Sequence, residues 1–243
     1  VLANTANVSC GGLNLVGTFQ SQGKITYTNG GGMSYYSNAV SDPLASIPEP
    51  TTAGLTDHGD VNITHDTTLD PGIYHNITIN QKGIAVTLNP GIYYLESGGS
   101  LKLQAGSLQG TGVMFFDDTG GDNILNKAAG TVDITPPTAS TGGTWPTGTT
   151  SATYSGISFW IPRSQTKEVH IESNFNLTMP GTWYAQAGEF DIRPDGAATV
   201  FNIGNYICDQ AEWCQGYGGG KSDGIINMNP TMGASTMRPL LVE

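Results

Sequence analysis

Three acidic residues, Asp117, Asp118 and Asp122, stand close together just after the apolar run 112–116. Carboxylates this near one another can share a proton or hold a divalent cation such as Ca²⁺. A solvated turn is the alternative, since Phe-Asp-Asp-Thr-Gly-Gly consists largely of turn formers. The turn is favoured, because the nearest cationic residue is Lys127 and no histidine is close. These acids are therefore weak candidates for a Ca²⁺ site, and no other metal or cofactor is expected.

The cysteines suggest a structural role. Five residues separate Cys208 from Cys214, a gap that a local disulfide can close in an exported chain. No Cys-x-x-Cys spacing is present, so we interpret this pair as a disulfide that closes a loop, not as metal ligands. The third cysteine, Cys10, is either a buried thiol or a link to another chain.

The remaining candidates for chemistry form no recognisable set. The four histidines, His58, His65, His75 and His170, include no pair spaced for two ligands on a helix and no metal-binding signature. The sequence also lacks a Gly-x-Ser-x-Gly elbow, a phosphate loop and a dinucleotide fingerprint. We therefore predict no catalytic residues and a protein that is not an enzyme.

A repeated phrase, x-Pro-Gly-x-aromatic, indicates how the chain is built. It occurs at Asp70–Tyr74, Asn89–Tyr93 and Met179–Trp183. Pro-Gly favours a type II turn, and each copy leads into β-branched or aromatic residues typical of a strand. The prolines of the first two copies are 90 − 71 = 19 positions apart, near the period of solenoids.

The phrase also predicts strand positions. Its aromatic residues should begin strands that stack in parallel walls, and four apolar residues should face the interior: Ile73, Ile92, Val113 and Ile157.

The composition supports an all-β fold. Of 243 residues 34 are Gly, and only 12% are charged, which suits short strands and tight turns and leaves few good helix formers. A β-sandwich would give a similar local pattern, but the repeated phrase favours a β-solenoid. We predict a single solenoid domain over residues 1–243, with the first 24 residues forming the first coil or two.

Three segments interrupt the strand pattern. A Pro-rich stretch at about 39–56 cannot lie inside a sheet, so we expect an excursion packed along the outside by Leu44 and Ile47, with a disordered linker as the alternative. Projecting loops are predicted at about 136–153 and 208–222. Trp145, in the first loop, either folds back onto the coils or is exposed and contacts a partner.

The charge limits the partners and location. A net charge of −11 and a pI near 4.5 repel phosphate backbones and anionic lipids, so nucleic acid is not an expected partner. No apolar run of about 18 residues could span a membrane. Because the chain begins at Val1 without a leader, we expect a membrane anchor upstream.

Several phrases together resemble one family. Asp42–Pro50, the Pro-Gly-x-Tyr phrases, Leu108–Phe116, Tyr154–Ile157 and Gly181–Ala185 are similar to the exported portion of bacterial tight-adherence (TadG/TadE-like) pilus-associated surface proteins. The resemblance implies a right-handed parallel β-helix outside the cytoplasmic membrane, carried by an upstream pilin-like helix. It implies no catalytic residues.

Two functions follow as expectations. The first is a non-catalytic extracellular structural or adhesion protein at the cell surface, a subunit of a pilus-associated assembly, whose partners are other surface proteins, copies of itself or a glycan. The alternative is a glycan-binding or glycan-cleaving β-helix enzyme, a polysaccharide lyase or hydrolase. Three arginines, Arg163, Arg193 and Arg238, are few for handling uronic acids.

Overall fold

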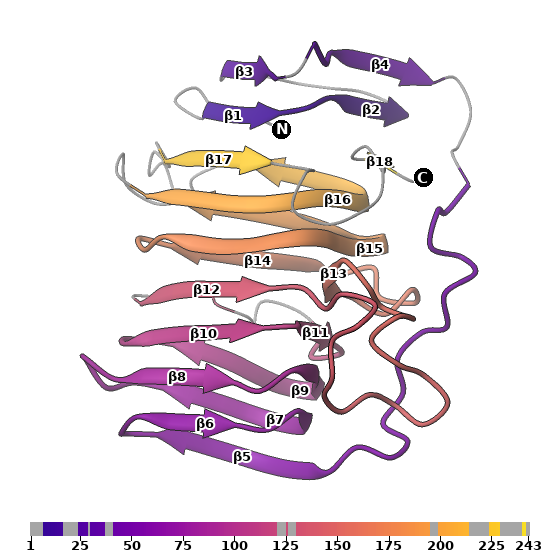
Figure 1. Cartoon of the computed structure of the whole chain (residues 1–243). Coiled ribbons are helices and arrows are strands. Elements are labelled where there is room, and N and C mark those ends of the chain that lie inside the picture. Colours follow the sequence, from indigo (N-terminus) through magenta and orange to yellow (C-terminus); the bar gives the residue numbers. More distant parts are fainter. Residues whose placement is uncertain are drawn as a thin grey trace.

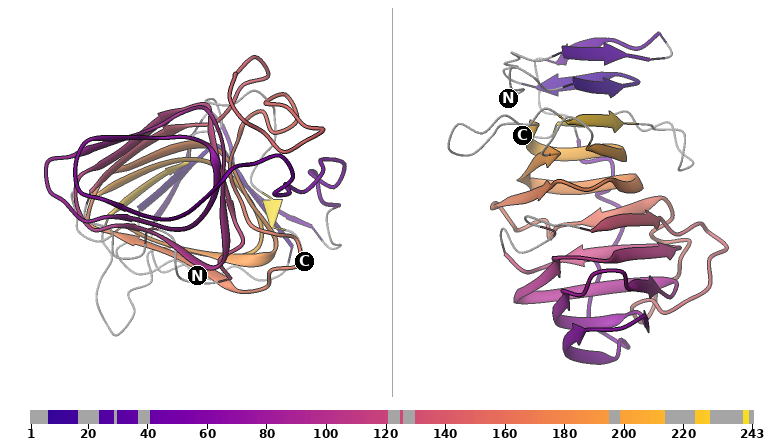
Figure 2. Two further views of the ribbon diagram at one scale, coloured as in Figure 1. Left: turned by 90° about the horizontal axis from the view of Figure 1, so that it is seen from below. Right: turned by 90° about the vertical axis from the view of Figure 1, so that its left-hand side faces the viewer.

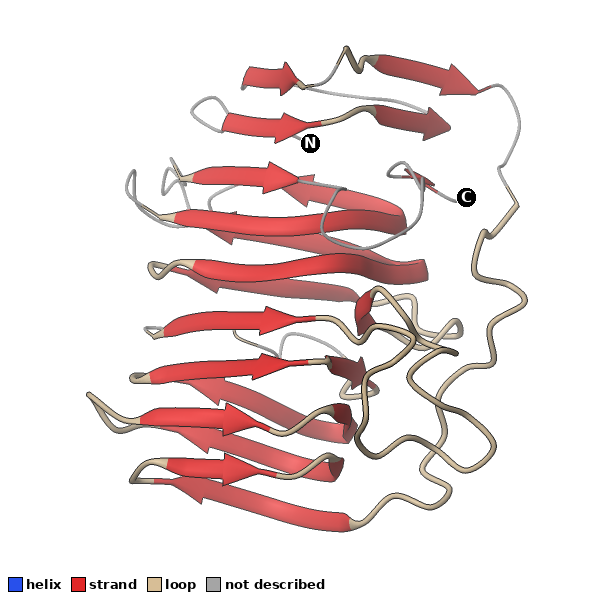
Figure 3. Cartoon of the chain, viewed as in Figure 1, coloured by secondary structure: helices blue, strands red, loops and turns tan. Residues whose placement is uncertain are grey.

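The computed structural model describes residues 7–16, 24–28, 30–36, 41–120, 125, 130–194, 199–213, 224–228 and 240–241. These residues form strands joined by loops and turns, without a helix (Figure 3). No helix within these ranges is therefore long and apolar enough to span a membrane.

All described strand pairs are parallel and stack into a β-solenoid of about eight turns, which confirms the predicted fold class. The pairs fall into three ladders, which we call walls A, B and C in the order that the chain visits them. The coils follow a closed, roughly triangular path around a common axis (Figure 2).

Most strands lie entirely within a single wall, A, B or C. Wall A contains β11 (Val113–Asp117), β13 (Ile157–Trp160), β18 (Leu240–Leu241), β2 (Leu13–Val16) and β4 (Met33–Tyr36). Wall B contains β14 (Glu168–Ser173). Wall C contains β6 (Thr67–Leu69), β8 (Ala85–Leu88), β10 (Ser107–Thr111), β12 (Thr131–Thr135), β17 (Ile225–Met228), β1 (Asn7–Cys10) and β3 (Lys24–Tyr27).

Five longer strands bend around corners and join more than one wall. Three of them cover walls A and B: β5 (Asp57–Ile63), β7 (Gly72–Ile79) and β9 (Gly91–Leu103). Two cover all three walls: β15 (Leu177–Pro194) and β16 (Val200–Trp213).

The order of the coils in space differs from their order in the sequence. Strand β1 pairs with β17, and β2 pairs with β18, so the N-terminal coils lie on the C-terminal end of the stack (Figure 1). The far end is formed by β5 and β6. The prediction that the first residues form solenoid coils is confirmed for β1 and β2, but these coils adjoin the last coil of the chain.

Residues 41–56 run along the outside of the stack toward β5 (Figure 1). Leu44 is only 2% exposed and Ile47 packs against the same apolar cluster on the outer side of wall A, as predicted. Loop 136–156 covers the neighbouring part of that cluster. Its Trp145 also packs there, so this side chain folds back onto the coils. We call residues 41–56 the crossing segment.

The repeated phrase forms a corner between walls C and A. In each copy the polar atom of the aromatic side chain donates to the carbonyl of the first residue of the phrase: Tyr74 to Asp70, Tyr93 to Asn89 and Trp183 to Met179. These bonds satisfy the polar end of a ring that lies in the core. Each phrase is thus a turn that anchors its own core residue.

The glycine of the phrase allows the corners to stack closely. Gly91 has a φ of 140°, and a Cβ there would lie 2.6 Å from both Pro71 Cβ and the carbonyl oxygen of Thr144. A side chain at this position would force neighbouring coils apart.

Aromatic rings stack through the interior from coil to coil. Ring contacts or strand pairing connect His58, Tyr74, Tyr93, Phe115, Phe159, Trp183 and Tyr206. Val113 faces this core as predicted. The prediction is wrong for Ile92 and Ile157, which belong to the cluster on the outer side of wall A, because Tyr93 and Phe159 take the inward positions. It is also wrong for Ile73, whose ladder partner Tyr94 packs against that outer cluster.

The first part of the second predicted loop is a strand instead. Strand β16 continues to Trp213, so residues 208–213 are strand, and residues 214–222 lie outside the described ranges. Cys208 is fully buried between Ala185 and Leu241 in the wall A ladder and is a free thiol. The expected disulfide is not supported, because Cys208 lies in a strand and points inward; Cys214 is outside the described residues.

Arg163 fastens the crossing segment to wall A. Its Nη2 donates to the carbonyl oxygens of Leu44 (2.8 Å) and Ile47 (2.9 Å), and its Nε donates to the Tyr184 hydroxyl at 2.9 Å. The Tyr184 hydroxyl donates in turn to Asp42 at 2.7 Å. The guanidinium also lies 4.8 Å from the ring centre of Trp160, a distance typical of cation–π contacts.

We predict that Arg163→Met lowers the free energy of unfolding by about 2 to 4 kcal/mol, since two carbonyls and a buried hydroxyl lose a charged donor. Urea unfolding would measure the loss, and limited proteolysis should show faster cleavage within residues 41–56. Lys102→Met, at an exposed position on wall B, is the control. Equal stability of the two variants would mean that Arg163 does not hold the segment.

Candidate functional site

The structure directs the predicted acids Asp117 and Asp118 to different sides of wall A. Asp117 ends β11 and points into the interior, where its ladder partner is the core residue Leu95. Asp118 points outward and accepts from the Tyr94 hydroxyl at 3.3 Å. Asp118 follows the last residue of β11, and the two side chains face opposite sides of the wall, so these two carboxylates do not form the Ca²⁺ site considered above. Asp122 lies outside the described residues.

Asp117 is a buried carboxyl group, and hydrogen bonds are found at only one of its two oxygens. Its Oδ1 accepts from the Thr119 backbone N–H (3.0 Å) and hydroxyl (2.6 Å), whereas Oδ2 has no hydrogen-bond partner in the described part of the chain. Burial raises the pKa of Asp117 from its ordinary value of 3.8 to about 6, although the Thr119 bonds act in the opposite direction. The protonated form is thus the one that the interior favours.

We predict that Asp117→Asn stabilises the protein relative to the parent by up to about 3 kcal/mol more at pH 7.5 than at pH 4. The folded parent holds a proton between pH 3.8 and about 6 that the unfolded chain has released. Its stability therefore falls as pH rises through this window, and the amide escapes that loss. Thermal melts across the range would measure it.

Asp133→Asn controls for the loss of one charge, because Asp133 is exposed on wall C. A difference between Asp117→Asn and its parent that stays constant with pH would contradict the assignment.

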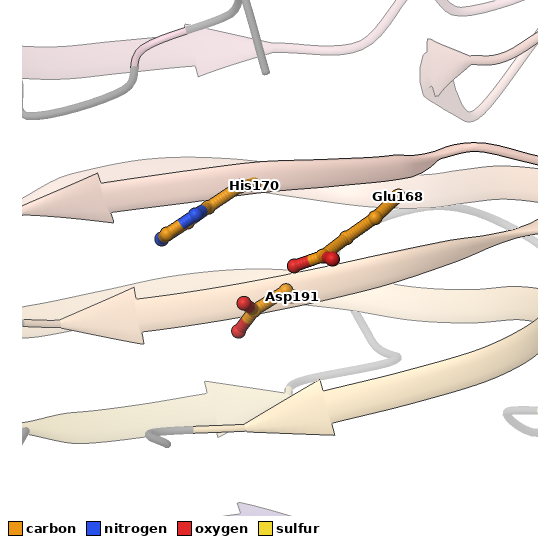
Figure 4. A group of neighbouring side chains, drawn as sticks. All are labelled: Glu168, His170 and Asp191. Carbon is orange, nitrogen blue, oxygen red and sulfur yellow. The ribbon is translucent and has the colours of Figure 1, made fainter. Parts of the chain in front are cut away.

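A second group lies on the outer side of wall B, which we call the wall B cluster: Glu168 and His170 of β14 with Asp191 and Arg193 of β15 (Figure 4 shows the first three). Ligand atoms of Glu168, His170 and Asp191 all lie within 4.8 Å of one another. Two carboxylates and an imidazole are a donor set that transition metals accept.

Arg193 occupies the centre of this cluster. Its Nε donates to Asp191 Oδ1 at 2.8 Å, its Nη2 contacts Asp191 Oδ2, and its Nη2 also lies 4.0 Å from Glu168. His170 Nε2 lies 3.5 Å from Glu172. A guanidinium on both oxygens of Asp191 repels a second cation, so these contacts describe an ion-pair network better than a metal site.

The cluster is largely closed to solvent. Asp191 is 0%, Arg193 5% and His170 9% exposed, whereas the Glu168 side chain is 42% exposed. Burial raises the pKa of Asp191, and its hydrogen bond with Glu168 raises it further, while Arg193 acts in the opposite direction. Burial thus favours the protonated form of Asp191, and the charge of Arg193 compensates the ionised form of this buried carboxyl group.

We predict that Arg193→Met destabilises the fold by about 3 to 5 kcal/mol, because it leaves a buried carboxyl without its cation. The loss should be larger at pH 8.5 than at pH 5, since a carboxyl with a raised pKa can be neutralised by protonation only at the lower pH. Urea unfolding at both values would measure it.

The double variant Asp191→Asn/Arg193→Met should recover part of the loss, and Lys167→Met, at an exposed position beside the cluster, should be neutral. Equal destabilisation of Arg193→Met at the two pH values would disprove the ion-pair account.

The wall B cluster was not anticipated from the sequence. Glu168 and His170 are two residues apart, as are Asp191 and Arg193, a spacing that places each pair on one side of a strand. Their meeting depends on the register that pairs His170 with Asp191, and the sequence alone does not show that register.

One outward column of wall C consists entirely of polar side chains. Following the strand register, the outward residues are Thr68, Thr87, Gln109, Asp133, Thr178, Asn202, Asn227, Ser9 and Thr26. Each is exposed or half-buried. We call this set the polar column.

Hydrogen bonds between rungs fix parts of the column. Gln109 donates to Thr87 (3.2 Å), and Asn227 donates to Asn202 (3.0 Å), which donates to Thr178 (3.4 Å). Neighbouring rungs of a sheet are about 4.8 Å apart, so hydroxyl and amide groups repeat at that interval along one face. The only ionisable residue in the column is Asp133.

No family model, no curated protein and no solved structure matches the chain. The β-solenoid is thus established by the strand pairing itself, and any function has to be argued from the polar column, the wall B cluster and the ends of the stack.

Proposed function

We propose that the chain is a non-catalytic structural and adhesion protein of the cell surface, and that it binds a glycan or another surface protein through the polar column of wall C. In this proposal it acts outside the cytoplasmic membrane, as in the tight-adherence pilus-associated proteins that its phrases resemble. A membrane anchor upstream of Val1 would hold it there.

The polar column is the observation that carries the proposal. Much of wall A directs its outward side chains into the apolar cluster beneath the crossing segment and loop 136–156, and the outward side chains of β14 and β15 on wall B form the wall B cluster. Elsewhere on wall B, outward positions such as Asn62 and Lys102 are exposed but form no column of polar side chains as continuous as that of wall C. The polar column of wall C instead keeps hydrogen-bonding side chains in contact with solvent over nine rungs, and all of them except Asp133 are uncharged. Such a flat, regular face is suited to an extended, repeating partner such as a polysaccharide, whose hydroxyl groups also repeat.

Glycan cleavage is the second candidate, and the wall B cluster is what favours it. A carboxyl group with a raised pKa beside a second carboxylate and an arginine could donate a proton to a glycosidic oxygen. However, Asp191, His170 and Arg193 are buried, so a polymer would reach only Glu168 of the cluster. The non-catalytic proposal therefore has the stronger support.

The test is sedimentation of the purified chain with insoluble cellulose and chitin, in parallel with assays for released reducing or unsaturated sugar ends. We expect binding without product. Thr178→Lys/Asn202→Lys should weaken binding about tenfold, because two long charged side chains interrupt the column. The matched control is Asn62→Lys/Thr78→Lys, which changes two neighbouring outward positions of wall B.

Equal binding by both double variants, or no binding to either polysaccharide, would argue against adhesion to glycan through wall C. Asp117→Asn/Asp118→Asn should bind like the parent. Release of sugar ends by the parent, abolished in Asp191→Asn, would replace the proposal by the enzyme.

A further inference from the structure

No described strand covers either end of the solenoid. At one end β3 and β4 pair only with β1 and β2, and at the other β5 and β6 pair only with β7 and β8, among the strands described. Each end therefore presents one edge of backbone N–H and C=O groups, which is a template for pairing with another strand.

The exposure of Tyr35 agrees with the lack of a covering coil over β4 among the described residues. Its ladder partner Leu15 is a core residue and is 4% exposed, so Tyr35 occupies an inward position. Even so, Tyr35 is 62% exposed, and the adjacent Tyr36 is 48% exposed. These two are the exposed large apolar side chains of the described residues, and both lie on this terminal coil.

The ends carry opposite charges. Residues 57–70 contain Asp57, Asp60, Asp66 and Asp70 and no lysine or arginine, whereas the only charged residue between positions 24 and 36 is Lys24. Two identical ends would repel one another, and two different ends attract. This favours head-to-tail contact over a symmetric dimer.

The strand register is also compatible with head-to-tail contact. All described coils run in the same direction, so a copy displaced along the axis continues the parallel ladders of walls A and C. Along wall C, the rung positions of Lys24, Thr26 and Tyr27 correspond at the far end to Asp66, Thr68 and Leu69. A lysine would thus meet an aspartate, a threonine a threonine, and an apolar side chain another.

The register of wall A is also compatible with head-to-tail contact. Its register leads from Tyr35 to the position of Gly59, next to His58. His58 already stacks on Tyr74, with ring centres 4.7 Å apart, at the end of the interior aromatic series. The exposed tyrosine would therefore cover a ring that has a neighbour on one side only.

From these observations we infer that copies of the chain stack end to end, with β3 and β4 of one copy pairing in parallel with β6 and β5 of the next. Such a heterologous contact does not close on itself, so it generates an open series of oligomers or a filament. This inference concerns the ends of the solenoid and is independent of glycan binding by wall C.

The test is sedimentation velocity of the purified 243-residue chain over a range of concentrations. We expect a series of dimers, trimers and longer species that grows with concentration. Lys24→Glu alone or Asp66→Lys alone should raise the concentration needed for association about tenfold, since each places like charges across the contact. Both positions are exposed, so these variants should fold, and thermal melts would confirm it.

Complementation makes the test specific. A mixture of the two single variants, and the double variant Lys24→Glu/Asp66→Lys, should both regain association because opposite charges meet again. Lys102→Glu, exposed on wall B, is the control and should assemble like the parent. A monomer at every concentration, a dimer that grows no further, or single variants that complementation does not rescue would overturn the inference.

Discussion

The path of the crossing segment is the constraint on which the rest of the structure depends. Because β1 to β4 lie beyond β17, the chain has to travel the length of the stack before β5 can begin. The outer side of wall A must therefore be as apolar as its inner side, and β11 and β13 are buried at every position. Strands buried on both sides read as continuous apolar runs, which is why Val-Met-Phe-Phe and Ile-Ser-Phe-Trp show no polar alternation.

The local parts of the fold could be predicted from the sequence because their causes are local. The Pro-Gly-x-aromatic phrase contains both its turn and the ring that donates back to the turn, and Pro43, Pro48 and Pro50 exclude a strand. The placement of β1 against β17 could not be predicted, because the residue pattern of β1 does not identify the distant strand with which it pairs. The inward assignment of Ile92 and Ile157 failed for a related reason: both sides of wall A are apolar, so hydrophobicity does not identify the interior side.

The candidate sites likewise depend on two kinds of information, the local sequence and the pairing of distant strands. Adjacent acids such as Asp117 and Asp118 are conspicuous in a sequence, but in a strand they face opposite sides and end in different environments. The wall B cluster arises instead from residues two apart on neighbouring strands. Its members are 21 positions distant in the pair His170 and Asp191 (191 − 170), close to the length of one coil. Only the register between coils, set by packing in the core, brings them together.

The two proposed surfaces lie at right angles, and this relation gives them a joint consequence. Binding by the polar column uses the side of the solenoid, whereas stacking uses its ends, so neither contact blocks the other. Stacking in the register described would place Thr26 of one copy beside Thr68 of the next and continue the polar column without interruption. A weak contact repeated along one rigid face gains strength through effective concentration. End-to-end assembly would therefore turn a modest affinity of wall C for a repeating polymer into firm attachment, with no change in any single contact.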